Sequence, residues 1–365
     1  MSYAETSISF CPNCANRSIY FAREPNWTGA FVVNMPNNKP LDILLYGVLV
    51  YDLLETLQRK LTTPAVITRL KENVSPEVLA AHTSRADVII ALKYLDMPPA
   101  PNLRLLHIPG AGLDQINFAE VPPQASVSNA YGHDVAGGEY VVMAMLAWCH
   151  EFVAAHVSMQ AGSWHMSGRT GAPFHEELYG KTVGILGLGP IGLAAARLAK
   201  AFGTTVLGCN RTLRATPEFI DTIYPLDQLH EFLRRCDFVA VCIALAPQTV
   251  GLIDRAALAR MKQSAVIVNV ARGAIIDEDA LYEALRKKTI AGAVIDAWYR
   301  YPTPEDLHVA PSKHPFASLF NVLMTPHSSI WTRGMIERRW TDIAKNIDAL
   351  ATGAELKNIV RRPLG

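Results

Sequence analysis

The sequence has no strong charge imbalance. Its 34 Lys and Arg residues almost match its 33 Asp and Glu residues, which gives a formal net charge of +1 at pH 7. This balance predicts neither a nucleic-acid nor a membrane partner, because both favour a strongly basic surface. No apolar run reaches the length of about 20 residues that spans a membrane, and residues 1–30 contain no apolar segment typical of a secretion signal. We therefore expect a cytoplasmic protein.

Cysteine is also scarce, with six residues in the chain. Cys11 and Cys14 form a C-x-x-C pair, which is half of a zinc site, but no second pair or suitably spaced histidines accompany it. We therefore expect no bound metal. The other four cysteines lie in helix or strand patterns, and we expect them to be small buried apolar residues. Residues 1–38 show little periodicity, which predicts a poorly ordered N-terminal extension.

The rest of the composition is ordinary for a globular protein. The chain has 365 residues, of which 50% are hydrophobic and 18% charged, and this length is enough for two domains. Short apolar strands alternate with helices from Leu41 to Ala130, and further units of this kind follow between residues 183 and 297. Continuous apolar strands separated by helices predict parallel sheets covered on both faces.

Two helices connect these sets of strands. One is predicted over residues 135–156, and the other, over residues 333–352, returns the chain to the first domain. The sequence thus predicts an α/β protein with two doubly wound parallel-sheet domains. These are a flavodoxin-like substrate domain, residues 39–133 and 326–365, and an inserted Rossmann dinucleotide-binding domain, residues 134–325. Two crossings between the domains create a hinge and a cleft.

The clearest functional signal is the stretch KTVGILGLGPIG at residues 181–192. A buried-strand pattern runs into a G-x-G-x-x-G turn, and an alanine-rich helix follows. Gly187 would allow the tight turn, Gly189 would let backbone amides approach a pyrophosphate, and Gly192 would let the helix pack closely on the strand. The helix N-terminus would hold the diphosphate. The alternative is a glycine turn with a structural role alone. The predicted coenzyme-binding residues of this turn are Gly187, Gly189, Pro190, Ile191 and Gly192.

Two basic side chains follow the ends of later strands. Arg272 comes just after the apolar run 265–271, and His327 follows the short strand 322–324. Each could be an ordinary residue, the arginine at the surface and the histidine structural. Together with a dinucleotide site they suggest hydride transfer to a 2-oxo acid, which needs a carboxylate clamp and a proton donor.

Five short motifs then occur in a characteristic order. They are PGAG at 109–112, GKTVGILGLG at 180–189, NVARG at 269–273, GAVID at 292–296 and TPH at 325–327. In this order they resemble the D-isomer-specific 2-hydroxyacid dehydrogenase family, over residues 103–347. The resemblance implies that Arg272 binds the substrate and that His327 is the acid/base residue. It also implies a homodimer built on the helix that begins near Val135.

The resemblance extends to further residues of the site. Asp296 resembles the aspartate that contacts the nicotinamide carboxamide, and a substrate loop is implied near Lys93. Backbone amides near this loop and the PGAG motif would complete the carboxylate site. The predicted substrate-binding residues are Lys93, Tyr94, Gly110, Ala111, Gly112 and His133. The predicted coenzyme-binding residues outside the glycine turn are Asn210, Arg211, Thr212, Arg214, Ala271 and Asp296.

The end of the second strand of the dinucleotide domain bears on the coenzyme. NAD-specific family members have Asp or Glu there to bind the ribose diol, whereas this chain has Asn210, followed by Arg211 and Arg214. Loss of a carboxylate and gain of two cations favour a 2′-phosphate, and hence NADP(H) over NAD(H). In the alternative, the arginines are solvated surface charges and either coenzyme binds.

The residue expected to support the histidine is unusual. The family usually has a glutamate just before the proline that follows Asp296, and here that position is Tyr301. A glutamate would stabilise the imidazolium, whereas tyrosine forms hydrogen bonds without carrying a charge near neutral pH. We therefore predict that reduction declines at a lower pH than is usual for the family, unless Glu305 or Asp306 folds back onto His327.

The predicted function is NAD(P)-dependent interconversion of a small 2-oxo acid, such as glyoxylate or hydroxypyruvate, and its D-2-hydroxy acid. Arg272, His327 and Tyr301 are its predicted catalytic residues. One alternative is hydride transfer without proton transfer, as in the formate dehydrogenases, which the segment 296–302 resembles in its aromatic content. Those enzymes have glutamine at the position of Tyr301 and asparagine near His133. Another alternative is a dinucleotide-sensing binding protein with idle catalytic residues.

Overall fold

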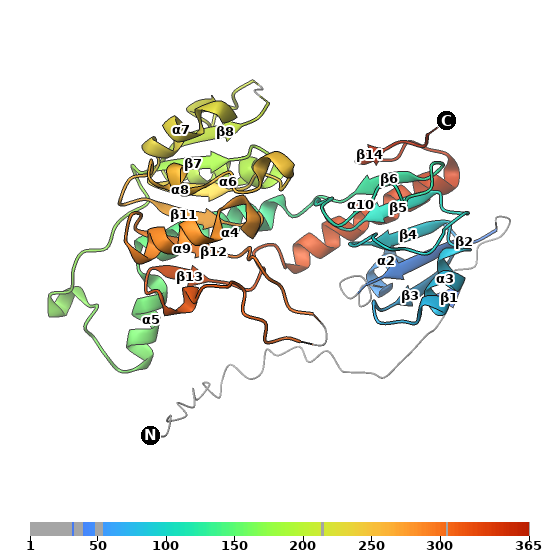
Figure 1. Ribbon diagram of the computed structural model, residues 1–365, viewed down its shortest axis with the longest axis horizontal. Helices are drawn as coiled ribbons and strands as arrows, with labels where there is room; N and C mark the ends of the chain where they lie inside the picture. The colour runs from blue at the N-terminus through green and yellow to red at the C-terminus, as the bar shows by residue number, and fades with distance from the viewer. Residues whose placement is uncertain (1–30, 33–38, 48–53, 213–214, 304–305, 365) are drawn as a thin grey trace.

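The structure, a computed structural model, describes residues 31–32, 39–47, 54–212, 215–303 and 306–364. Its strands form two seven-stranded sheets, which lie side by side in Figure 1. Of the predicted N-terminal extension, the edge strand β1 (Phe31–Val32) falls within these ranges. Cys11, Cys14, Arg214 and Glu305 lie outside the described residues.

The first sheet has the order β1-β3-β2-β4-β5-β6-β14. Its five inner strands are parallel and follow the flavodoxin-like order, second-first-third-fourth-fifth along the chain. The edge strands β1 and β14 run antiparallel to their neighbours. The strands after β1 are β2 (Leu41–Tyr46), β3 (Ala65–Leu70), β4 (Val88–Ala91), β5 (Leu105–Ile108), β6 (Ser126–Asn129) and β14 (Ile359–Arg361).

The second sheet is parallel throughout and has the order β13-β12-β11-β10-β7-β8-β9. This is the Rossmann order with one further strand at the β12 edge. The two sheets confirm the predicted fold class. The strands are β7 (Thr182–Leu186), β8 (Thr205–Asn210), β9 (Thr222–Pro225), β10 (Phe238–Val241), β11 (Val266–Asn269), β12 (Gly292–Ile295) and β13 (Val322–Met324).

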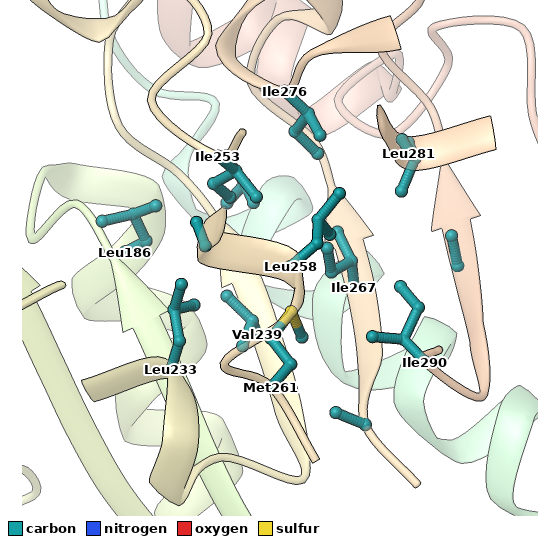
Figure 2. Close-up of a cluster of buried hydrophobic side chains, with 14 of the residues drawn as sticks. Leu186, Leu233, Val239, Ile253, Leu258, Met261, Ile267, Ile276, Leu281 and Ile290 are labelled. Atoms are coloured by element: carbon teal, nitrogen blue, oxygen red, sulfur yellow. The ribbon is translucent and has the colours of Figure 1, made fainter. Parts of the chain in front are cut away.

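Helices cover both faces of each sheet, so each sheet separates two hydrophobic clusters. Figure 2 shows the cluster on one face of the second sheet, where Val239 and Ile267 of the strands meet Leu233, Leu258 and Leu281 of the helices. Burial of this apolar surface is the main force that stabilises the domain. The helices are α2 (Leu54–Lys60), α3 (Pro76–Thr83), α4 (Asp134–Cys149), α5 (Phe152–Gln160), α6 (Pro190–Ala201), α7 (Leu229–Arg235), α8 (Arg255–Leu258), α9 (Glu278–Arg286) and α10 (Arg333–Thr352). Short 3₁₀ turns are η2 (Gly168–Thr170), η3 (Leu226–Gln228), η4 (Pro247–Thr249), η5 (Gly273–Ile275) and η6 (Phe316–Ser318).

The chain crosses between the sheets twice, at the beginning of α4 and again before α10 (Figure 1). The two crossings are joined, because Arg338 Nε of α10 donates to the Gly132 carbonyl oxygen at 2.9 Å. Trp340 and Ile343 of α10 are buried against the first sheet. Helix α10 thus returns the chain to the sheet in which it began.

One predicted element is wrong. The single helix expected over residues 135–156 is two helices, because Glu151 adopts a left-handed backbone conformation, with φ of 47°, and ends the helical hydrogen bonding. Helices α4 and α5 are bent by 62° at this break. None of the described helices alone has the length and apolar content of a membrane span, and this bent pair meets those criteria only when taken together.

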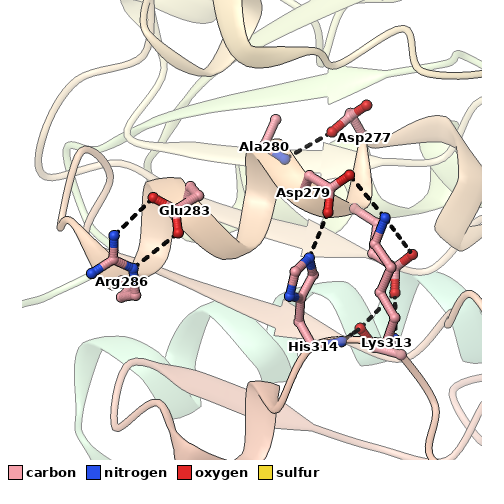
Figure 3. A network of polar contacts seen from close by, with 9 residues as sticks. Asp277, Asp279, Ala280, Glu283, Arg286, Lys313 and His314 are labelled. Atoms are coloured by element: carbon pink, nitrogen blue, oxygen red, sulfur yellow. Dashed lines mark hydrogen bonds and ion pairs between the residues drawn. The ribbon is translucent and has the colours of Figure 1, made fainter.

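The segment after β12 is fixed at its far end to helix α9 (Figure 3). Asp279 forms an ion pair with Lys313 Nζ at 2.8 Å and contacts His314 Nε2 at 2.6 Å. Glu278 Oε1 accepts hydrogen bonds from the Ser312 hydroxyl at 2.6 Å and from the Lys313 amide at 2.8 Å. These contacts attach residues 312–314, which precede β13, to helix α9.

Candidate active site

The glycine turn between β7 and α6 has the geometry of a pyrophosphate cradle. Gly187 has φ of +99°, and a Cβ there would lie 2.5 Å from the Ile243 backbone. A Cβ at Gly192 would lie 2.0 Å from the Gly187 carbonyl oxygen, so the turn and the helix can touch only without side chains. A Cβ at Gly189 would meet no atom within 4 Å, and no side chain caps the helix there. The free helix N-terminus therefore faces open space that suits a diphosphate.

Asn210, at the end of β8, lies beside this turn. Its Oδ1 accepts a hydrogen bond from the Leu188 amide at 3.4 Å, and its Nδ2 donates to the Thr212 carbonyl oxygen at 2.8 Å. Arg211 is exposed and forms no ion pair with any residue that the structure describes. The site therefore offers an uncharged amide and a free cation where a ribose would lie.

Other predicted coenzyme residues pack around the turn. Pro190 is the first residue of α6, and Ile191 lies against α4, where a Cβ at Gly137 would be 3.0 Å from it. The amide of Ala271 donates to Asn269 Oδ1 at 3.1 Å, at the end of β11. These contacts shape the turns at the carboxyl edge of the sheet, where ligands of doubly wound folds bind.

Arg272 follows β11 and points toward the first domain. Its Nη1 donates to the Ala271 carbonyl oxygen at 2.9 Å, and its Nη2 lies 3.5 Å from Asp114 Oδ1. A Cβ at Gly112 would lie 2.7 Å from Nη2, so the PGAG loop and the arginine are in direct contact. The two domains therefore meet at this guanidinium.

His327 follows β13 and is half-buried, with φ of 55°. Burial lowers the pKa of its imidazole, the nearby Arg272 lowers it further, and Asp296 opposes them. His327 Nδ1 lies 2.8 Å from the hydroxyl oxygen of Tyr301, which also accepts a hydrogen bond from the Trp298 amide at 3.0 Å. Burial raises the pKa of the Tyr301 hydroxyl, which keeps the phenol neutral. The histidine is therefore paired with a neutral partner.

Of the two acidic residues proposed as substitutes for the missing glutamate, Glu305 lies outside the described residues, and Asp306 forms no hydrogen bond or ion pair with His327. Asp306 Oδ1 instead accepts a hydrogen bond from the His308 amide at 3.0 Å.

Asp296, at the end of β12, organises the histidine loop. The carboxylate is fully buried and accepts hydrogen bonds from the Thr325 hydroxyl at 2.7 Å, the Ser328 amide at 2.8 Å and the Ser329 amide at 3.0 Å. These bonds hold both sides of His327, whose left-handed conformation is uncommon outside glycine. The expected contact of Asp296 with a nicotinamide stays a prediction.

The PGAG loop presents unpaired amides beside Arg272. The carbonyl oxygens of Gly110 and Ala111 accept hydrogen bonds from the Ala130 amide and from Asn129 Nδ2, both at 3.1 Å. The Ala111 and Gly112 amides donate no hydrogen bond to any residue that the structure describes. A carboxylate held by Arg272 would therefore meet two free N–H donors.

The prediction for Tyr94 is wrong. Its side chain is 1% exposed within a core cluster of the first domain, and its amide donates to the Gln115 carbonyl oxygen at 2.9 Å. Neither its ring nor its amide is therefore free to bind a substrate. Lys93, the preceding residue, is exposed.

His133 lies at the first crossing and is buried, with 6% of its surface exposed. Burial and the nearby Arg339 lower its pKa to about 4, and Arg272 contributes a smaller effect in the same direction. Arg339 Nη2 lies 3.5 Å from His133 Nδ1. The sequence patterns did not indicate Arg339, which lies within α10 and meets His133 only through the fold.

Comparison with known proteins then assigns the family. The model of the D-isomer specific 2-hydroxyacid dehydrogenase NAD binding domain matches residues 142–329, which is more than half of the chain. This chain belongs to the D-isomer-specific 2-hydroxyacid dehydrogenase family. The predicted family resemblance is thereby confirmed. The nicotinamide dinucleotide fits the site, since the glycine turn leaves open space at an uncapped helix N-terminus.

Relatives within the family differ in length. D-3-phosphoglycerate dehydrogenase from Methanocaldococcus jannaschii is 32% identical over 266 residues, which cover 72% of this chain and 48% of that protein. The chain therefore spans about half the length of the phosphoglycerate dehydrogenases that it matches. Glyoxylate reductase from Thermococcus onnurineus is 30% identical over 314 residues, 84% of this chain and 85% of that protein.

A solved structure supports the same fold. An NADPH-dependent glyoxylate/hydroxypyruvate reductase from Sinorhizobium meliloti, in complex with NADP and sulfate, superposes with a TM-score of 0.70 at 22% identity. The match covers 88% of this chain and 98% of that one. The two-domain architecture is therefore common to both proteins.

Proposed function

We propose that this chain is an NAD(P)-dependent oxidoreductase that interconverts a small 2-oxo acid and its D-2-hydroxy acid. One observation carries the proposal. Arg272 and His327 follow β11 and β13, two parallel strands of one sheet, so both lie at the carboxyl edge where ligands of this fold bind. In agreement with this placement, the guanidinium lowers the pKa of the imidazole. A carboxylate clamp and a proton donor are the two groups that this reaction requires of the protein.

Each residue has a distinct role in the proposed reaction. Arg272 and the free amides of Ala111 and Gly112 would hold the substrate carboxylate, and the same guanidinium would polarise the carbonyl. A bound nicotinamide coenzyme would supply or accept the hydride. His327 would donate a proton to the carbonyl oxygen during reduction and take it back during oxidation. Tyr301 would hold the imidazole ring in place.

The test is a panel of 2-oxo acids, including glyoxylate and hydroxypyruvate, with nicotinamide absorbance as the readout. We expect turnover with at least one acid, and we expect His327→Gln to lower kcat by at least about 100-fold. The exposed His308 provides the matched control, since His308→Gln removes an imidazole from the neighbouring loop. Tight coenzyme binding without turnover of any acid would favour the dinucleotide sensor, and oxidation of formate would favour the formate dehydrogenase alternative.

We further propose that NADP(H) is the preferred coenzyme. Asn210 uses its amide to hold the glycine turn and carries no charge to repel a 2′-phosphate, and Arg211 is free to bind one. We expect a higher kcat/KM with NADPH than with NADH, and Asn210→Asp should reverse this preference. A wild-type enzyme that prefers NADH would overturn the proposal.

We also propose a homodimer formed through α4 and α5. Met143, Phe152 and Val157 stand exposed on this face, and α5 extends away from the second sheet in Figure 1. An apolar cavity of about 480 Å³ lies between α4 and α6, lined in part by Leu146 and Leu198. Since isolated proteins rarely expose such a continuous apolar face, a second copy of the chain would cover it. Light scattering should give a dimer that Phe152→Asp dissociates, and a wild-type monomer would contradict the proposal.

A further inference from the structure

Arg339 of α10 is a buried cation without a counter-ion in the described part of the chain. Only 9% of its surface is exposed, and its Nε lies buried without a hydrogen-bond partner. Burial lowers the pKa of the guanidinium to about 10, and no described carboxylate opposes this effect. Among the described residues, the polar partner of the guanidinium is His133 Nδ1, which lies 3.5 Å from Nη2. An unpaired buried charge is costly, so such a group is expected to gain stability when an anion binds.

This arginine lies where the two crossings between the sheets meet. His133 directly precedes α4 at the first crossing, and Arg339 lies beside it at the second. Arg272 is close enough to His133 to lower its pKa, as it does for His327. Two carboxylates are near this group: Asp114 contacts Arg272, and Asp134 raises the pKa of His133. Neither compensates the charge of Arg339.

One substrate carboxylate would already be held by Arg272, whose planar fork binds one carboxylate in a bidentate manner. We propose that Arg339 and His133 form a second anion subsite, which binds a distal carboxylate or phosphoryl group of the 2-oxo acid. This inference rests on the proposed function and narrows its substrate class to acids with two anionic ends. Carboxylate and phosphoryl oxygens share the acceptor chemistry that a guanidinium recognises.

Matched substrate pairs test the subsite. Oxaloacetate is compared with 2-oxobutyrate, 2-oxoglutarate with 2-oxovalerate, and 3-phosphohydroxypyruvate with hydroxypyruvate. Each pair differs mainly in the distal anion, so the ratio of kcat/KM values within a pair reports its recognition. We expect at least one pair to favour the doubly anionic acid by at least about 10-fold. The pair with the largest ratio identifies the carboxylate or the phosphoryl group as the ligand.

Arg339→Met, which keeps much of the side-chain volume, should lower kcat/KM about 100-fold for the doubly anionic acid of that pair. For the singly anionic acid of the pair, kcat/KM should fall at most about threefold. For both acids the change should arise mostly from a higher KM. Lys345→Met is the matched control, because it removes an exposed cation of the same helix that forms no hydrogen bond or ion pair with any described residue. Its substrate ratio should equal that of the wild type.

The outcomes separate the two proposals. If the wild type reduces no 2-oxo acid, the proposed function fails. If it reduces the acids without favouring any doubly anionic member, or if Arg339→Met lowers both members of a pair equally, the subsite proposal fails and Arg339 is structural. If Arg339→Met does not fold, His133→Asn carries the same comparison, and an unchanged ratio in that variant overturns the proposal.

Discussion

Replacement of Tyr301 by glutamate should move the pH dependence of 2-oxo acid reduction upward. The Tyr301 hydroxyl lies 2.8 Å from His327 Nδ1 and can form a hydrogen bond with either protonation state of the ring. The charge of a carboxylate stabilises the imidazolium more than the neutral ring. Because burial and Arg272 lower the pKa of His327, the wild-type enzyme should lose its proton donor at a comparatively low pH.

The size of the shift follows from Coulomb's law. A carboxylate about 5 Å from the imidazolium contributes roughly 3 kcal/mol at an effective dielectric constant of about 20. The glutamate side chain is shorter than that of tyrosine, and Tyr301 is 43% exposed, so water will weaken this interaction. We therefore expect the midpoint of the decline in the reduction rate to move up by about one to two pH units.

The assay is kcat/KM for reduction from about pH 5 to about pH 10, which reports the ionisation of the free enzyme. Tyr301→Phe keeps the ring but removes the hydroxyl, so it should slow the reaction without an upward shift of the midpoint. If Tyr301→Glu retained the wild-type midpoint while remaining folded and active, position 301 would not control the proton affinity of His327.

Three further predictions concern the glycine turn, the histidine loop and the core of the first sheet. Gly192→Ala places a Cβ 2.0 Å from a carbonyl oxygen of the glycine turn, so it should lower both the melting temperature and the affinity for coenzyme. The Cβ of Gly189→Ala meets no atom within 4 Å, so this variant should weaken coenzyme binding alone. Thermal melting and coenzyme titration of both variants provide the test. Asp296→Asn puts an N–H group where both oxygens accept hydrogen bonds, and should destabilise the fold by about 2 kcal/mol in urea unfolding and lower kcat by misplacing His327. His107 is fully buried, which lowers its pKa to about 4 in the folded protein. Because the unfolded chain binds this proton near pH 6.5, the free energy of unfolding should fall by roughly 3 kcal/mol as the pH falls from about 6.5 to about 4. His107→Gln should reduce this dependence of the free energy of unfolding on pH. An unchanged dependence would show that His107 is not the group responsible.

The sequence predicted most of the fold because the evidence for it is local. Buried parallel strands such as 238–241 are continuous apolar runs, and the glycine turn needs its three glycines at fixed spacing. The short strands β9 and β14 were missed because they lie at sheet edges, where their alternating burial leaves weak apolar patterns. The break at Glu151 was missed because nothing in the local apolar pattern marks a left-handed residue.

The site itself was only partly predictable. Arg272 and His327 could be identified because each follows a strand end within a recognisable motif. Tyr94 was misassigned because the substrate loop that the family resemblance implies does not reveal that the ring turns into the core. Arg339 contacts His133, which is 206 residues away in the sequence, so its burial depends on two distant crossings that happen to meet. Such contacts are set by packing and not by local sequence pattern.

Arg272, His133 and His327 are linked by their charges. Arg272 lowers the pKa of both His133 and His327, so in the free protein the cations of the cleft disfavour additional positive charge. An anionic substrate would reverse this effect, because its carboxylate would lie between the guanidinium and the imidazole that Arg272 now opposes. Binding of the substrate would therefore favour protonation of His327, and the proton donor would be charged mainly when a carbonyl is present to receive the proton. Because Tyr301 is neutral and burial and Arg272 outweigh the effect of Asp296, the substrate anion would supply this control.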